Sequence, residues 1–299
     1  MFTDWHELAT KRILVIGEAL IDIVQGVEIV GGSPANVALG LGRLGANTEL
    51  LTALGNDERG NRIANHLTAS HVTVLRESFT LHHTSTARAS LRADGSAVYD
   101  FDIDWRLPAT GLPSFDLLHV GSIACFLEPG ASVLAGVIRD ASERGARVTF
   151  DPNIRPALVD PAQARARVEE IARFASAVKL SDEDAELIYP GASLESVLEN
   201  LLALGPGLVA ITRGGSGAMI ATPTQRVTVA APPTTVVDTV GAGDTFMAAM
   251  IACLSNLGDS PLHRDDLTGI GEFCVKAAAL TVARAGADLP RLEELAGPS

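Results

Sequence analysis

The sequence predicts a three-layer α/β fold: a mainly parallel central sheet covered by helices on both faces, with a small additional β-sheet. Short apolar runs alternate along the chain with segments of helical periodicity, which is typical of such a sheet. One segment breaks this alternation and has the pattern of a β-hairpin. The chain has 299 residues, of which 47% are hydrophobic, so it can bury a large core. We therefore expect a single domain over residues 1–299.

The expected elements follow one another in regular order. Apolar runs predict strands at residues 12–16, 48–54, 117–120, 147–150, 177–180 and 208–211. Helical patterns between them predict helices at residues 34–44, 57–69, 129–144 and 161–174. Pro34 suits the first turn of its helix, because the amide that proline lacks has no partner there in any case. Ligands of such sheets bind beyond the carboxyl ends of the strands, so a site is expected at that edge.

The segment that breaks the alternation spans residues 85–103. Its apolar residues alternate on either side of Asp94-Gly95, a pair typical of a tight hairpin turn. Tyr99 and Phe101 lie two residues apart and therefore face the same side of their strand. With the strand-like segment 20–30, this hairpin predicts the small sheet, formed from about residues 20–31 and 84–105.

Composition and charge exclude several classes of protein. The net charge of −13 argues against nucleic acid or an anionic membrane as the partner. No apolar run approaches the ~20 residues that cross a bilayer, and residues 1–11 lack the apolar stretch of a secretory signal. The three cysteines, Cys125, Cys253 and Cys274, lie in apolar contexts without metal-ligand spacing, so reduced thiols are expected. These features favour a cytoplasmic enzyme.

Residues 238–246, Asp-Thr-Val-Gly-Ala-Gly-Asp-Thr-Phe, form the first candidate for a functional site. The apolar residues after them recur at helical spacing, so Gly241, Ala242 and Gly243 precede or open a helix. The first turn of a helix has amides without intrahelical partners and a positive dipole end, so these residues are candidates to bind a phosphate. Asp244 then lies where a carboxylate can accept a proton from an attacking hydroxyl. Taken alone, the string is also consistent with a plain strand-to-helix turn.

A second candidate string, Gly31-Gly32-Ser33-Pro34-Ala35-Asn36, opens an expected helix near the N-terminus. Asn36 faces inward from that helix, and Asp22 follows the first strand. Asp22, Gly32 and Asn36 together offer two polar side chains and a close backbone approach for binding hydroxyl groups. A Gly-Gly pair before a helix is also common in ordinary turns, so this string needs support from the first one.

The two strings, in this order, resemble the signatures of the ribokinase-like (PfkB) family of carbohydrate kinases. The resemblance implies transfer of the γ-phosphoryl group of ATP, with Mg²⁺, to a primary hydroxyl of a small sugar. It implies that Asp244 is the base, that the amides of residues 241–243 bind the transferring charge, and that Asp22, Gly32 and Asn36 bind the sugar. The expected partners are therefore ATP and a sugar.

In that family the small sheet is a lid over the sugar, and closing a lid excludes water that competes as phosphoryl acceptor. Tyr99 and Phe101 are accordingly candidate sugar contacts. Packing of these rings against the main domain or a partner subunit is the alternative. Exposed lid edges also favour a homodimer formed through the lid.

Two further strings extend the resemblance into the second half of the chain. Residues 150–156, Phe-Asp-Pro-Asn-Ile-Arg-Pro, look like a string of fructokinases and 2-keto-3-deoxysugar kinases, and they make Arg155 a candidate for binding the sugar or the transferred phosphate. Asp-Pro-Asn is also ordinary turn chemistry. Residues 211–218 resemble the family's nucleotide loop, from which Thr212, Gly214 and Gly217 are carried over to ATP binding. A glycine-rich β-turn is the alternative there.

The metal positions depart from the family pattern. Where the family usually has Asn-x-x-Glu, linked to magnesium and phosphate, this chain has Ser181 and Asp184. Both replacements keep an oxygen ligand, so Ser181 is assigned to the nucleotide and Asp184 to Mg²⁺. A magnesium ion that keeps several waters tolerates the shorter carboxylate of aspartate. A serine-capped helix is the alternative reading. Arg284-Ala285-Gly286-Ala287 resembles a segment that, with the loop around Asp238, binds a monovalent cation such as K⁺, which makes Asp238 and the Val240 carbonyl candidate ligands.

One motif points to a different class of protein. Gly40-Leu41-Gly42-Arg43-Leu44-Gly45 matches the dinucleotide fingerprint Gly-x-Gly-x-x-Gly of oxidoreductases. That fingerprint must follow a strand and open a helix, whereas these glycines fall late in the helix expected at residues 34–44. Gly45 there ends the helix, and the small residues allow close helix packing.

The acceptor sugar is assigned from the combination of strings. Gly-Glu-Ala-Leu-Ile-Asp, Gly-Gly-Ser-Pro-Ala-Asn and Asp-Pro-Asn-Ile-Arg-Pro most resemble fructokinases, which implies D-fructose. Ribokinase and 2-keto-3-deoxygluconate kinase are the alternatives, since one fold serves several sugars. A non-catalytic sugar-binding regulator is the alternative from another class.

Overall fold

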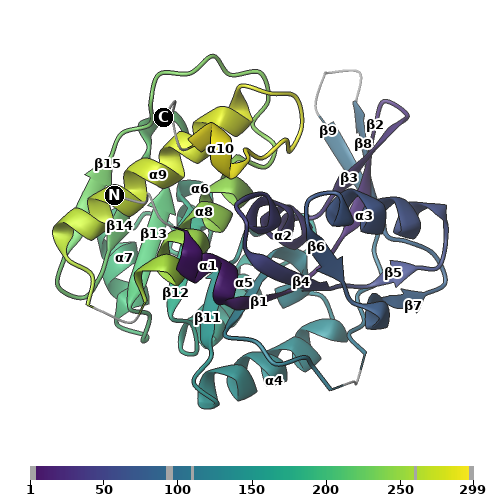
Figure 1. The fold of residues 1–299 in the computed structure, drawn as a ribbon, viewed down its shortest axis with the longest axis horizontal. Coiled ribbons are helices and arrows are strands. Elements are labelled where there is room, and N and C mark those ends of the chain that lie inside the picture. Colours follow the sequence, from purple (N-terminus) through teal and green to yellow (C-terminus); the bar gives the residue numbers. More distant parts are fainter. Residues whose placement is uncertain (1–4, 92–96, 109–110, 259–260, 296–299) are drawn as a thin grey trace.

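The structure, a computed structural model, describes residues 5–91, 97–108, 111–258 and 261–295; of residues 89–91 and 97–99 it describes the backbone only. It confirms the expected fold class: a large, mainly parallel sheet lies between two layers of helices, and a separate small sheet projects from one end (Figure 1).

Among the described residues, the large sheet has nine strands. From one edge to the other it contains β15 (Arg226–Val229), β14 (Ala218–Ala221), β13 (Leu208–Thr212), β12 (Ala177–Ser181), β11 (Arg147–Asp151), β10 (Leu117–Gly121), β1 (Arg12–Ile16), β4 (Asn47–Leu51) and β6 (Val72–Val74). Neighbours from β13 to β6 are parallel, whereas β14 and β15 run antiparallel at one edge. The carboxyl ends of β1 and β10 to β13 therefore share one edge, where a ligand site is expected.

The hydrophobic core lies on both faces of this sheet, as the alternation along β1 illustrates. Ile13 and Val15 join one buried cluster, and Leu14 and Ile16 join the other. The first cluster is covered by α1 (His6–Thr10), α2 (Ser33–Arg43), α3 (Glu58–Thr68), α8 (Ala242–Leu257), α9 (Arg264–Val282) and α10 (Leu292–Leu295). The second is covered by α4 (Gly130–Glu143), α5 (Pro161–Ala172), α6 (Asp182–Ile188) and α7 (Leu194–Leu202). Short 3-10 turns lie at η1 (Arg76–Ser78), η2 (Ser122–Cys125) and η3 (Gly214–Ser216).

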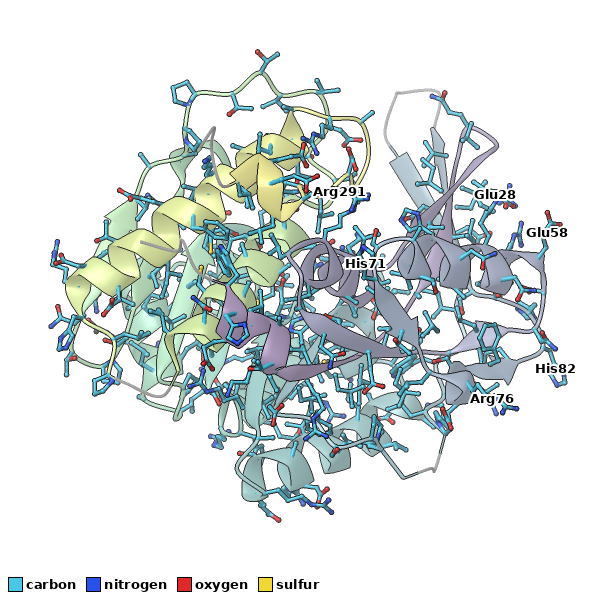
Figure 2. All side chains as sticks on the ribbon, viewed as in Figure 1. Glu28, Glu58, His71, Arg76, His82 and Arg291 are labelled. Atoms are coloured by element: carbon cyan, nitrogen blue, oxygen red, sulfur yellow. The ribbon has the colours of Figure 1, made fainter. Side chains whose placement is uncertain are left out.

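The small sheet has four strands, in the order β3 (Val27–Gly31), β2 (Leu20–Val24), β8 (Thr86–Leu91) and β9 (Ala97–Asp102). β8 and β9 form the antiparallel hairpin that the sequence predicts, although its Asp94-Gly95 turn lies outside the described residues. Glu28 on β3 forms ion pairs with Arg59 and Arg62 of α3. Figure 2 shows Glu28 beside that helix, so these pairs join the small sheet to the main body.

Most expected strands and helices agree with the structure to within one or two residues. The run at 48–54 is the exception, because it divides into β4 and the short β5 (Leu54–Gly55), which pairs with β7 (Phe79–Leu81) in a separate two-stranded sheet. The backbone N–H of Thr52 donates to Ser78 Oγ instead of joining the ladder, which ends β4. A run of apolar residues does not by itself reveal that β4 pairs with β1 whereas β5 pairs with β7.

The three cysteines are free and buried, in agreement with the expectation of reduced thiols. In the described part of the chain, every helix is too short or too polar to span a bilayer.

Candidate active site

The first turn of α8 carries the candidate phosphate turn. Gly241 precedes the helix with a φ of 80°, a left-handed conformation that favours glycine. A Cβ at Gly241 would lie 2.8 Å from the Cβ of Ala287, so the turn packs directly on the Arg284–Ala287 segment. Asp244 lies in this first turn and is 6% exposed. The sequence prediction that these glycines open a helix is therefore confirmed.

The Asp244 carboxylate connects helix α8 with helix α2, which lies about 200 residues earlier in the chain. Ser33 Oγ donates to its Oδ1 at 2.6 Å, and Asn36 Nδ2 donates to its Oδ2 at 2.8 Å. Both donors lie in the first turn of α2, which packs against α8 through the first core cluster. The two strings identified in the sequence thus meet at one carboxylate. Ser33 was not singled out from the sequence, although it lies within the Gly-Gly-Ser-Pro-Ala-Asn string.

Asp22 and the glycines that follow it form a second part of the site. A Cβ at Gly31 would lie 1.9 Å from Asp22 Oδ2, so Gly31 leaves the space that this carboxylate occupies. Gly32 has a φ of 106°, and a Cβ there would approach the Glu18 carbonyl oxygen to 2.6 Å. Burial raises the pKa of Asp22 to about 6, and the positive charge of Arg155 offsets part of this shift. Asp22 and Arg155 therefore face the same region.

Arg155 is exposed and curls back onto the preceding turn. Its Nη1 donates to the Asn153 side-chain oxygen at 2.6 Å, and Asn153 itself has a positive φ of 36°. The guanidinium is held by neutral oxygens and stays available for an anionic or polyhydroxyl ligand. Its proposed contact with a sugar or phosphate remains a prediction.

Glu18 is a buried acid close to the candidate site, and it belongs to the Gly-Glu-Ala-Leu-Ile-Asp string. It is 4% exposed, and its Oε2 accepts from the backbone N–H of Ala124 at 3.0 Å. Burial raises its pKa to about 7, although bonds from Ser122 and Ala124 and the charge of Arg155 act in the opposite direction. The signal available in the sequence was an acidic residue two positions after the end of the first apolar strand.

A buried ion pair between Lys179 and Asp151 lies beneath the phosphate turn. Lys179 Nζ donates to Asp151 Oδ2 at 2.8 Å across the neighbouring strands β11 and β12. Lys179 is 3% exposed and Asp151 is fully buried. Burial raises the pKa of Asp151 to about 6 even though Lys179 lowers it. Burial alone would lower the pKa of Lys179, but the charges of Asp151, Asp184 and Asp244 outweigh it and raise that pKa.

Ser181 and Asp184 form a capping box at the start of α6. Ser181 Oγ accepts from the Asp184 amide at 2.9 Å, and Asp184 Oδ2 accepts from the Ser181 amide at 3.1 Å. Asp184 Oδ1 also accepts from the Ile154 amide at 2.9 Å. Among the described residues, no group of three or more His, Cys, Asp or Glu side chains is arranged to hold a metal. The structure thus gives Asp184 a structural role, and metal binding there stays a prediction.

The predicted nucleotide loop connects β13 to β14 and includes the short turn η3. Thr212 ends β13 directly beside Ser181 of β12, and Thr212 Oγ1 donates to the Leu180 carbonyl at 3.4 Å. Gly214 and Gly217 have φ values of 49° and 85°. A Cβ at Gly217 would lie 1.9 Å from the Val229 carbonyl oxygen, so this turn requires glycine. Ser181 and Thr212 therefore lie together at the carboxyl edge of the sheet.

Asp238 fixes the loop that precedes α8. Its Oδ1 accepts from the Val240 amide at 3.0 Å, and its Oδ2 accepts from the Gly286 amide at 2.8 Å. These two bonds hold the pKa of Asp238 below its ordinary value. The Asp238 and Arg284–Ala287 strings therefore lie together, as the resemblance implied. Cation binding by Asp238 and Val240 is not tested by these contacts.

The aromatic residues of β9 are only partly described. The backbone of Tyr99 pairs with Ala89, but its side chain lies outside the described residues. Phe101 pairs with Ala87 of β8 and is partly buried. Neither sugar contact is tested.

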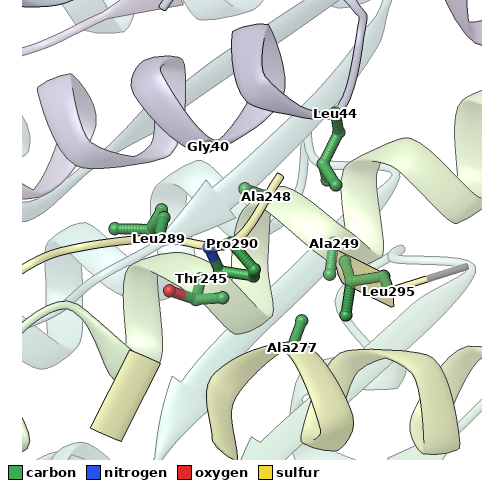
Figure 3. A pocket seen from close by; sticks show the side chains of 9 residues that line it. All are labelled: Gly40, Leu44, Thr245, Ala248, Ala249, Ala277, Leu289, Pro290 and Leu295. Carbon is green, nitrogen blue, oxygen red and sulfur yellow. The ribbon is translucent and has the colours of Figure 1, made fainter. Parts of the chain in front are cut away.

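A small pocket near Asp244 has a different character. It lies between α2, α8, α9 and the segment around Leu289 and Pro290, and its lining is almost entirely apolar (Figure 3). Thr245 contributes the hydroxyl, which bonds to the Gly241 carbonyl and to Thr281. The polar groups there are satisfied, so the pocket is a packing feature behind the phosphate turn.

Comparison with known proteins gives consistent matches. The model of a family described as pfkB family carbohydrate kinase matches residues 8–294. The fructokinase of Salmonella typhimurium is 34% identical over 267 residues, covering 83% of this chain and 85% of that protein. A fructokinase double mutant from Vibrio cholerae O395, solved with fructose, ADP and potassium ion, is 27% identical with a TM-score of 0.83, covering 95% of this chain and 97% of that one. The ATP-bound fructokinase of Xylella fastidiosa is 26% identical with a TM-score of 0.80, and the match covers 95% of this chain and 96% of that chain.

Proposed function

Because the chain belongs to the pfkB family of carbohydrate kinases, it is a sugar phosphotransferase, and we propose that it phosphorylates a primary hydroxyl of D-fructose with ATP. The observation that carries this proposal is the junction at Asp244. A buried carboxylate in the first turn of α8 accepts bonds from Ser33 and Asn36 at the start of α2. A glycine turn that can bind a phosphate therefore adjoins a fixed proton acceptor.

In the proposed reaction, Asp244 accepts the proton of the attacking hydroxyl. Its two oxygens are held by Ser33 and Asn36, so the carboxylate is oriented before the substrate arrives. The amides of Gly241, Ala242 and Gly243 are the proposed donors for the charge on the transferring oxygens, and the Ala242 amide would give up its 3.3 Å bond to the Thr239 carbonyl to do so. Gly241 adopts a left-handed conformation immediately before α8, and the amides at the start of a helix are suited to binding a phosphate.

The sugar side of the proposal uses Asp22, Gly32, Asn36 and Arg155. Asp22 is partly buried and the charge of Arg155 acts on it, so the two groups offer an acceptor and a donor for sugar hydroxyls. The assignment of fructose rests on the relatives that are named fructokinases and on the structure of one that contains fructose. Tyr99 and Phe101 of the lid sheet are proposed as additional ring contacts.

ATP is proposed to bind with its phosphates at the first turn of α8 and its nucleoside near Ser181, Thr212, Gly214 and Gly217. Fructokinases with bound ATP or ADP support this use of nucleotide. Mg²⁺ would supply charge neutralisation of the phosphates. Asp184 is the carboxylate proposed to hold this ion, largely through water, while its oxygens accept hydrogen bonds from the amides of Ile154 and Ser181.

Three further expectations accompany the proposal. A monovalent cation such as K⁺ is proposed at the loop of Asp238 and Val240, because a relative was solved with potassium ion. A homodimer through the lid sheet is proposed because its strands β2 and β3 expose Val24, Val27 and Ile29. A cytoplasmic location is proposed from the free, buried cysteines.

The experiment that tests the proposal is ADP release measured with MgATP and a panel of acceptors. We expect the highest kcat/KM with D-fructose, lower values with ribose and 2-keto-3-deoxygluconate, and phosphorylation at a primary hydroxyl by NMR. A preference for either other sugar would replace fructose as the acceptor. No ADP release with any acceptor, together with sugar binding by calorimetry, would instead identify a non-catalytic regulator.

A further inference from the structure

We infer that Lys179 is a positioning residue of the transfer site: its buried ammonium, held by Asp151, places a fixed positive charge behind the glycine turn of α8. The inference rests on the proposed function, since it concerns the phosphoryl group that this turn would bind. The chain contains lysine only at Lys11, Lys179 and Lys276, so this buried cation has no neighbouring lysine to replace it.

The position of the ammonium is the first observation. Lys179 lies on β12, and its Nζ donates to Asp151 Oδ2 at the end of β11. A Cβ placed at Gly243 would lie 3.0 Å from Lys179 Nζ. The ammonium therefore lies directly against the backbone of the turn whose amides are the proposed phosphate donors. Glycine at position 243 leaves room for this approach.

The charge balance is the second observation. Asp151, Asp184 and Asp244 all act on Lys179 through their negative charges. ATP would add several negative charges at the same edge of the sheet, and like charges in a poorly solvated site repel strongly. Lys179 is the buried cation within this group of carboxylates. It offsets their charge where the transferring phosphoryl group would lie.

A merely structural role must be distinguished from this one. Buried Asp151 needs a partner, and removal of Lys179 alone would leave it unpaired and destabilise the fold. The double substitution Lys179→Met with Asp151→Asn removes both charges and so avoids that penalty. If Lys179 serves only to neutralise Asp151, the double variant recovers full activity. If its charge acts on the turn, the double variant folds but remains impaired.

The decisive measurement is binding of ADP with aluminium fluoride, a mimic of the transferring phosphoryl group, in the presence of Mg²⁺ and fructose. We expect the double variant to bind this complex roughly 10²-fold more weakly than the parent protein, with a similar fall in kcat, as for loss of one anion-hole donor. Affinities for fructose alone and for ADP alone should change little. Asp151→Asn, which keeps the lysine, should retain most of the affinity for the fluoride complex.

Matched controls make each outcome informative. Lys276→Met removes a lysine whose Nζ bonds to the Leu295 carbonyl, away from the site, and should leave both measurements unchanged. Parent-like fluoride binding and turnover in the folded double variant would overturn the inference. An equal loss in Asp151→Asn would also overturn it, and that variant decides the matter if the double variant does not fold. Failure of the proposed function would look different, because the parent protein itself would then phosphorylate none of the sugars.

Discussion

Asp244 is the residue on which the proposed chemistry depends, and its surroundings fix the orientation of its carboxylate. Two neutral donors, Ser33 Oγ and Asn36 Nδ2, bind one oxygen of the carboxylate each. Its backbone lies in the first helical turn, where the dipole favours a negative side chain. The same bonds also hold the beginnings of α2 and α8 together.

Replacing Asp244 by Asn tests its role as the proton acceptor. The amide keeps the size of the side chain but removes its basicity, so kcat should fall by about 10²–10⁴-fold. The affinity for fructose and the thermal melting temperature should stay close to those of the parent protein. Steady-state kinetics, calorimetry and a thermal melt measure the three quantities. A folded Asp244→Asn protein with near-parent kcat would refute the assignment.

Glu18 predicts a specific dependence of stability on pH. Its pKa is raised from 4.5 to about 7, so the folded protein holds a proton that the unfolded chain has released between these values. The stabilisation from Glu18 is therefore complete below about pH 4.5 and is lost as pH rises through about 7. Asp22 and Asp151, with pKa values of about 6, contribute in the same direction.

The variant Glu18→Gln isolates this contribution. It keeps the shape of the protonated acid but cannot ionise, so its stability relative to the parent should increase between pH 5 and pH 7.5. Each unit of pKa shift corresponds to about 1.4 kcal/mol, which sets the scale of the change. Urea unfolding of both proteins at the two pH values measures it. An identical difference at both pH values would contradict the raised pKa of Glu18.

At the scale of elements, the site forms where α2, α8 and the carboxyl ends of the parallel strands converge. The sequence predicts the start of α8 and the start of α2 well, because glycine and proline mark them locally. The hydrogen bonds from Ser33 and Asn36 to Asp244 depend on how these two helices pack, which periodicity does not reveal. The Lys179–Asp151 pair depends on β11 and β12 being neighbours in the sheet, and strand order is likewise not a local property.

The conformation of Gly241 gives a prediction for the α8 turn. Alanine there must adopt a φ of 80° and must also fit a Cβ that would lie 2.8 Å from the Cβ of Ala287. Gly145 is a matched control, because it has a φ of 81° but no atom within 4 Å of the added Cβ. Gly145→Ala should cost only the backbone strain, about 1–2 kcal/mol.

Gly241→Ala should destabilise the protein by a further ~1–3 kcal/mol, because the clash adds to the strain. It should also lower kcat, since the turn must shift away from the Arg284–Ala287 segment. Chemical denaturation and steady-state kinetics of both variants provide the comparison. Equal stability losses in Gly241→Ala and Gly145→Ala would show that the contact with Ala287 relaxes freely.

At the scale of the whole molecule, the proposed ligands lie across two sheets. Asp22 belongs to β2 of the small sheet, whereas the phosphate turn begins α8 on the main body. The ion pairs of Glu28 with Arg59 and Arg62 join the two parts on the outside. Exposed ion pairs contribute little, so the main link between the two parts is the burial of Ile21 and Ile23 of β2 in the first core cluster, and a bound sugar is expected to add to it.

Ligand-induced stabilisation tests this arrangement. A ligand that binds only the folded protein stabilises it by about 2.7 kcal/mol at a concentration of 100 Kd. Fructose and ADP should therefore each raise the melting temperature of the parent protein. Asp22→Asn should lose the fructose-induced shift, because the sugar loses a charged acceptor, but should keep the shift caused by ADP. Asp102→Asn changes an exposed acid on β9 of the same small sheet and should keep both shifts. An undiminished fructose shift in Asp22→Asn would place the sugar elsewhere, whereas loss of both shifts would mean that the substitution disturbs the fold beyond the small sheet.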